Sequence, residues 1–129
     1  MSQLTRAIND QASAVKFYDV LEEMAPKQYR DFVTHAKNDE MVHVRLFSKL
    51  YRRLTGYDPS VQVQATQFSS YQEGLEIAFR SELEAAETYR DMYLNTRVPK
   101  IRDVLFKTMT DEMEHAQRFN FLYTVLRNS

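Results

Sequence analysis

Four long stretches of this chain carry apolar side chains at spacings of three and four residues, which is the period of an amphipathic helix. They cover about residues 2–25, 27–55, 71–95 and 99 to nearly the C-terminus. Residues typical of helix boundaries stand at their ends: Pro26, Gly56, Ser70 and Pro99. The 129-residue chain has only two glycines and three prolines, too few turn residues for a sandwich, a barrel or a dinucleotide-binding fold. We therefore expect one all-α domain over residues 1–129.

The lengths of the connections predict how these helices are arranged. Hardly any residues separate the first helix from the second, or the third from the fourth, so each pair should form an antiparallel hairpin. Residues 56–69 connect the pairs and, when extended, could span about 46 Å, against roughly 37 Å for a 25-residue helix. We expect an extended crossover along the length of an up-down four-helix bundle.

The two predicted hairpins also resemble each other in sequence. Residues 39–54 and 111–126 are identical at eight of sixteen positions, and both begin with the word Asp-Glu-Met-x-His. A weaker match relates residues 7–18 to 78–89 at nearly the same offset. The chain is thus predicted to consist of two related halves.

A polar group interrupts each apolar stripe near its middle. In chain order these groups are Gln11, Glu40 with His43, Glu82, and Glu112 with His115. Their distances from the predicted turns place all of them at one level of the bundle. Because a buried carboxylate without a partner costs several kcal/mol, three carboxylates and two imidazoles on core faces require compensation. A layer of this kind predicts a pocket for cations.

Glu and His three positions apart lie on one helix face and can address the same metal ion or adjacent ions. Two such pairs, with one carboxylate from each remaining helix, make up the ligand set of di-iron and di-manganese bundles. Over all four helices the chain resembles the ferritin-like superfamily and, within it, the rubrerythrin and bacterioferritin branch. The resemblance implies a ferritin-like fold.

The same resemblance implies a role for each polar group of the layer. Glu40 and Glu112 would bridge two metal ions, His43 and His115 would be terminal ligands, and Glu82 would be a terminal carboxylate. Gln11 stands where such families place Glu, and its neutral amide is a weaker ligand. Two readings of this position are open: metal ligation, or an amide hydrogen-bonded to the neighbouring carboxylates.

Four further residues are predicted to lie around the centre. Asp39 and Asp111 resemble the carboxylates that orient metal-bound imidazoles, with Asp39 serving His115 and Asp111 serving His43; the alternative is that both are solvated. Tyr18 and Tyr89 occupy positions where related proteins keep a tyrosine near the metals, and they are either redox participants or ordinary core residues. His35 lies beside its stripe as a flanking residue.

Function follows from the resemblance as an expectation. It implies two iron ions, or manganese, and a reaction of Fe(II) with peroxide or dioxygen. The chain has no cysteine for a rubredoxin-type centre, so an external donor would supply any further electrons. The alternative is a degenerate bundle that lost a full site at Gln11 and has a structural or interaction role.

Composition limits the partners and the location of the protein. A formal net charge of −1 gives no excess positive field for binding nucleic acid or an anionic membrane surface. No run of apolar residues is long enough to span a membrane, and the first residues lack the apolar core of a signal peptide. These features predict a cytoplasmic protein. Because no fifth helix follows the fourth, we expect a homodimer and not a storage cage.

Overall fold

The computed structural model describes residues 2–129 and is mostly helical in that range. Its helices are α1 (Ser2–Met24), the 3-10 turn η1 (Lys27–Tyr29), α2 (Arg30–Thr55), α3 (Tyr71–Asn95) and α4 (Pro99–Arg127). No strand occurs among these residues. None of the described helices combines the length and apolar character needed to cross a bilayer.

The helix boundaries agree with the predicted ones except at the start of α2. Pro26 has an extended backbone, and the chain first forms the η1 turn, so the α-helix begins at Arg30 and not at residue 27. Gly56 ends α2 in the left-handed conformation (φ 78°), where a residue without Cβ is favoured. Ser70 caps α3 by accepting a hydrogen bond from the backbone N–H of Glu73.

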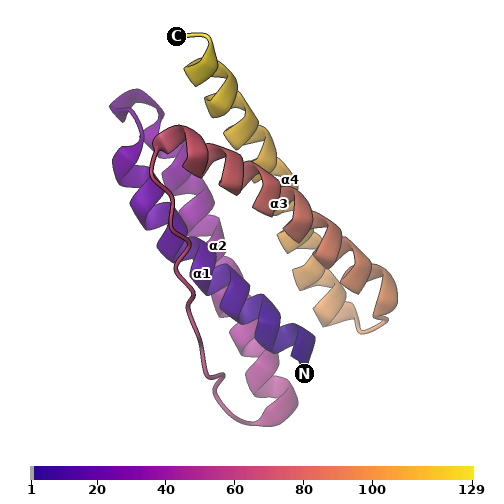
Figure 1. Ribbon diagram of the computed structural model, residues 1–129. Coiled ribbons are helices and arrows are strands. Elements are labelled where there is room, and N and C mark those ends of the chain that lie inside the picture. Colours follow the sequence, from indigo (N-terminus) through magenta and orange to yellow (C-terminus); the bar gives the residue numbers. More distant parts are fainter. Residues whose placement is uncertain (1) are drawn as a thin grey trace.

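Two antiparallel hairpins, α1–α2 and α3–α4, form the bundle (Figure 1). The crossover, residues 56–70, runs in an extended conformation beside α1 and returns the chain to the other end of the bundle, so α3 runs parallel to α2 (Figure 1). Asn9 and Ser13 of α1 hold the crossover by accepting hydrogen bonds from the backbone N–H groups of Gln62 and Gln64. The predicted all-α, ferritin-like bundle of two hairpins is confirmed.

The hydrophobic core consists of two separate clusters. One contains Leu21, Val33, Leu75 and Phe119, among others, and lies toward the α1–α2 turn. The other surrounds Phe47 and lies toward the α3–α4 turn. Between them, near the middle of every helix, the polar side chains of the predicted layer are buried. The apolar packing therefore stops on both sides of a polar layer.

Candidate metal centre

All six polar residues predicted from the sequence meet in this buried layer. Each exposes at most 3% of its surface: Gln11 from α1, Glu40 and His43 from α2, Glu82 from α3, and Glu112 and His115 from α4. The buried polar residues of the described chain include no lysine or arginine. The carboxylates therefore have the two imidazoles, the Gln11 amide and the Tyr18 hydroxyl to compensate their burial.

An aspartate on the opposite α-helix holds the outer nitrogen of each imidazole. His115 Nε2 lies 2.8 Å from Asp39 Oδ2, and His43 Nε2 lies 2.8 Å from Asp111 Oδ2. Both contacts are those predicted from the sequence. Because Nε2 is engaged outside the layer, the Nδ1 atom of each ring faces the middle of the layer, as a metal-binding imidazole requires.

Around His115 the layer contains a group of possible ligands for one ion. His115 Nδ1 lies 2.5 Å from Glu82 Oε2 and 3.3 Å from Glu112 Oε1. One ligand atom from each of Glu40, Glu82, Glu112 and His115 lies within 4.8 Å of all the others. Three oxygens and one imidazole nitrogen at such spacing are donors that suit iron, manganese or zinc.

Around His43 the arrangement is different, because Gln11 occupies the position that Glu82 has near His115. Gln11 Nε2 donates hydrogen bonds to Glu112 Oε2 (3.0 Å) and to the hydroxyl of Tyr89 (2.9 Å). Gln11 Oε1 lies 3.0 Å from His43 Nδ1. The amide is thus fully hydrogen-bonded within the protein, as one of the two readings of this position expected.

Two carboxylate oxygens in the layer lack the partners that burial requires. Glu40 Oε1 and Glu112 Oε1 are buried and have no hydrogen-bond partner among residues 2–129. Glu40 Oε1 lies 3.0 Å from His43 Nδ1 and Glu112 Oε1 lies 3.3 Å from His115 Nδ1, but these nitrogens form their hydrogen bonds with Gln11 and Glu82. An unsatisfied buried acceptor costs about 1–3 kcal/mol, and more when charged. A cation between these oxygens would satisfy both, so the residues present fit a metal ion.

The protonation of the layer reflects the crowding of its carboxylates. Burial, and then the charges of Glu112 and Glu82, raise the pKa of Glu40 well above its usual value. Burial also raises the pKa of Glu82 to about 8. Burial opposes a charged imidazole at His115, but the carboxylates of Asp39, Glu112 and Glu82 around the ring outweigh it and raise the pKa to about 11. These raised pKa values favour the protonated forms of Glu40, Glu82 and His115.

Two tyrosines contact the layer, and each one contacts a polar residue of the other hairpin. Tyr18 of α1 lies beside Glu82 of α3, where it lowers the pKa of that carboxyl, and Tyr89 of α3 accepts the hydrogen bond from Gln11 of α1. Burial raises the pKa of both phenols, so both hydroxyls stay protonated and can donate. Both residues also stack on core aromatic rings, Tyr18 on Phe119 and Tyr89 on Phe47.

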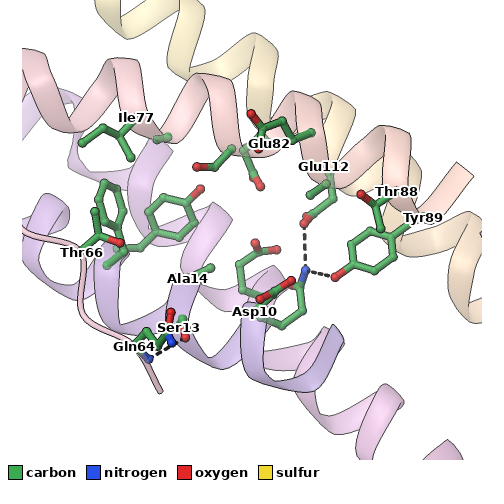
Figure 2. Close-up of a pocket in the computed structure, with 18 residues that line it drawn as sticks. Asp10, Ser13, Ala14, Gln64, Thr66, Ile77, Glu82, Thr88, Tyr89 and Glu112 are labelled. Atoms are coloured by element: carbon green, nitrogen blue, oxygen red, sulfur yellow. Dashed lines mark hydrogen bonds between the residues drawn. The ribbon is translucent and has the colours of Figure 1, made fainter. Parts of the chain in front are cut away.

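A cleft between α1 and α3 leads from the surface to the layer (Figure 2). Its volume is about 350 Å³. Gln11, Glu40, Glu82 and Glu112 line it, whereas neither histidine does. Ser13, Gln64 and Thr66 belong to its outer wall, where the crossover lies over α1 (Figure 2). A small molecule entering the cleft would meet the carboxylates first.

Sequence reasoning missed two residues that contact the outer aspartates. His35 Nε2 lies 3.3 Å from Asp39 Oδ2, and Lys107 Nζ lies 2.8 Å from Asp111 Oδ2. Each stands four positions before its aspartate, and the two are related by the 72-residue offset of the repeat. The four-residue spacing between each of these residues and its aspartate was the available signal in the sequence. It becomes informative only once the aspartates are known to hold the imidazoles.

The fold and this buried set of carboxylates and histidines define a ferritin-like protein. A family model described as rubrerythrin matches residues 73–129, which contain α3 and α4. An uncharacterised protein of Bacillus subtilis, YhjR, is 31% identical over 117 residues, which are 90% of this chain and 81% of the relative. The chain belongs to the rubrerythrin family of the ferritin-like superfamily.

Two solved structures share the fold. A hypothetical protein from Pyrococcus furiosus superposes with a TM-score of 0.85 at 21% identity, covering 98% of this chain and 89% of that one. A conserved hypothetical protein from Mycobacterium tuberculosis superposes with a TM-score of 0.80 at 16% identity, covering 94% of each chain. At these identities the likeness concerns the arrangement of the helices.

Proposed function

We propose that this chain is a non-haem iron protein of the oxidoreductase type, in which the buried layer holds iron while Fe(II) reacts with peroxide or dioxygen. The two unsatisfied oxygens, Glu40 Oε1 and Glu112 Oε1, carry this proposal, because a bound cation is the simplest partner for both. Six possible ligands from four helices are enough for the two ions that the family resemblance implies. Manganese suits the same oxygen and nitrogen donors.

The residues of the chain would bind the ion and admit the oxidant. Glu40, Glu82 and Glu112 offer oxygens at the floor of the cleft, and Asp39 and Asp111 fix the direction of the two imidazoles. Bound iron would supply electrons, two Fe(II) and two protons converting one peroxide into two Fe(III) and two waters. Tyr18 and Tyr89 line the same cleft, and their protonated hydroxyls are neutral donors beside the layer.

Anaerobic loading with Fe(II), followed by addition of hydrogen peroxide or dioxygen, tests this function. We expect the near-ultraviolet absorbance of Fe(III) to rise faster than in a solution of Fe(II) alone. The double variant Glu40→Gln/Glu112→Gln should lose this acceleration. Glu76→Gln, an exposed substitution on α3, is the matched control and should keep it. Oxidation at the same rate with and without the protein would contradict the proposal.

A second candidate is a degenerate bundle with a structural or interaction role, and the satisfied bonds of Gln11 favour it. It predicts partial or no metal binding: after anaerobic reconstitution the protein should hold well under one iron ion per chain, and its unfolding temperature should not respond to Fe(II). A homodimer, a cytoplasmic location and an external electron donor remain part of the first proposal. Size-exclusion chromatography with light scattering tests the dimer directly.

A further inference from the structure

The internal repeat allows the two halves of the metal layer to be compared residue by residue. Most pairs are identical or equivalent: Glu40 with Glu112, His43 with His115, Asp39 with Asp111, and Tyr18 with Tyr89. Among the residues that contact the imidazoles or the aspartates holding them, two pairs differ, Gln11 with Glu82 and Lys107 with His35. Both Gln11 and Lys107 contact the His43 side of the layer, Gln11 directly and Lys107 through Asp111. The two departures from symmetry therefore fall in the same half.

Gln11 has no negative charge, unlike the equivalent Glu82, and it hydrogen-bonds to His43 Nδ1, the atom that would bind a metal. The Oε1 atom of an amide can only accept a hydrogen bond, so its contact with His43 Nδ1 places a proton on that nitrogen. The amide cannot turn over freely, because its Nε2 donates to the acceptor oxygen Glu112 Oε2. An ion at His43 would have to break these bonds. Besides Glu40 and Glu112, whose Oε1 atoms lie 3.0 Å and 3.7 Å from His43 Nδ1, it would gain only the neutral oxygen of Gln11.

Lys107 acts on the same half from outside the layer. Its ammonium lies 2.8 Å from Asp111 Oδ2, the oxygen that also contacts His43 Nε2. In the other half the corresponding group is the imidazole of His35, which contacts Asp39 Oδ2 and Glu114. Glu114 adds little net charge there, because Arg118 pairs with it at 2.9 Å. The permanent positive charge of Lys107 makes the Asp111 carboxylate a weaker hydrogen-bond acceptor for His43 Nε2. With a weaker partner, His43 is a weaker metal ligand.

We infer that the centre holds a single tightly bound ion, in the half formed by Glu40, Glu82, Glu112 and His115. The His43 half remains a hydrogen-bonded part of the protein, closed by Gln11 and Tyr89. The inference rests on the proposed function only in that the layer binds a metal. It replaces the expected pair of equivalent ions by one ion in an identified half.

Titration with Co(II), which needs no redox reaction to be detected, tests the number and place of the ions. Native mass spectrometry should show one tightly bound ion per wild-type chain, and anomalous scattering from cobalt-soaked crystals should place it beside His115. Two ions of similar affinity, or one ion beside His43, would overturn the inference. These measurements on the wild-type protein do not depend on any variant folding correctly.

Exchanging the amide between the halves gives a sharper test. Gln11→Glu restores the missing carboxylate and should bring the count to two ions, whereas Glu82→Gln should lose the tight ion. The double variant Gln11→Glu/Glu82→Gln carries the amide in the other half, so it should again bind one ion, now beside His43. A double variant whose ion stays beside His115 would show that the amide does not decide the position.

Lys107 can be tested in the Gln11→Glu background. Lys107→His copies the His35 side and should tighten the second ion by roughly twofold to fivefold, the size of an exposed charge effect. Lys100→His, an exposed change at the start of α4, is the matched control and should leave that affinity unchanged. An equal effect of Lys107→His and Lys100→His on the affinity would show that Lys107 does not weaken metal binding beside His43.

The results also separate this inference from the proposed function. One cobalt ion beside His115, together with no acceleration of Fe(II) oxidation, would support the single-ion centre and refute the oxidoreductase. Two tightly bound ions with rapid oxidation would support the oxidoreductase and refute the single-ion centre. A chain that binds no ion would refute both.

Discussion

Asp39 and Asp111 hold the two imidazoles in the same way, yet the single-ion centre makes their mutations unequal. Asp39→Asn leaves the ring of the ligand His115 without its carboxylate, and loss of such a partner typically weakens metal binding about 10–100-fold. Asp111→Asn acts on His43 and Lys107, neither of which would bind the tight ion, and should change its affinity much less. Competition titration with a chromophoric chelator measures both. Equal losses would indicate that both histidines bind metal.

The protons of the metal-free layer give its stability a definite pH dependence. The folded pKa values of Glu82 (about 8) and His115 (about 11) lie above their ordinary values of 4.5 and 6.5. Such groups stabilise the fold fully below the ordinary pKa, and this contribution is lost as the pH rises through the folded pKa. The lowered pKa of Glu112 contributes in the opposite direction, but only when the pH falls below about 4.5.

Metal-free protein should therefore become less stable as the pH rises from about 6 to about 9. Urea unfolding followed by circular dichroism at several pH values checks this. The metal-loaded protein is the comparison, because a bound ion replaces these protons and should flatten or reverse the slope. A metal-free protein that gains stability over this interval would contradict the protonation described here.

At the scale of the elements, the start of α3 depends on the absence of a side chain at Gly74. A Cβ atom there would lie 2.7 Å from Leu21 Cδ1 and 2.7 Å from the ring of Phe68, so these side chains would have to move. Leu21 is completely buried. We expect Gly74→Ala to destabilise the protein by about 1–3 kcal/mol despite the better helix propensity of alanine. Thermal unfolding measures the change, and an increase in stability would show that the neighbours adjust easily.

The elements could be predicted from the sequence because each depends on local signals. Apolar periodicity gave the four helices, and Gly56 and Ser70 gave two of their ends. The η1 turn was missed, because proline at the first position is compatible with both a 3-10 and an α-helical start. Glu73 Oε1 accepts from the backbone N–H of Ser69, whereas a capping box would place this bond on Ser70.

The layer itself was predictable, but the inequality of its halves was not. Stripe positions place the six polar residues at one level, and the repeated word suggests which aspartate serves which histidine. His35 and Lys107 each contact an aspartate of their own helix, so their roles became visible only when the structure showed these aspartates holding imidazoles across the bundle. The orientation of the Gln11 amide likewise follows only from its three contacts, with Glu112, Tyr89 and His43.

At the scale of the whole molecule, metal binding should stabilise the fold. An ion present at 100 times its dissociation constant adds about 2.7 kcal/mol to the free energy of unfolding. We expect differential scanning calorimetry with Co(II) or Mn(II) to show a clear rise in unfolding temperature for the wild type and none for Glu82→Gln. A rise of the same size in both proteins would place the stabilising ion elsewhere on the molecule.

The division of the apolar interior into two clusters has a consequence for the life of the protein in a cell. Without an ion, the clusters meet only through a layer of crowded, partly protonated groups, which is where the bundle is easiest to open. Open chains are the ones that proteases degrade, so a small change in stability alters abundance several-fold. We therefore expect the amount of this protein to follow the supply of its metal, even when its synthesis is constant.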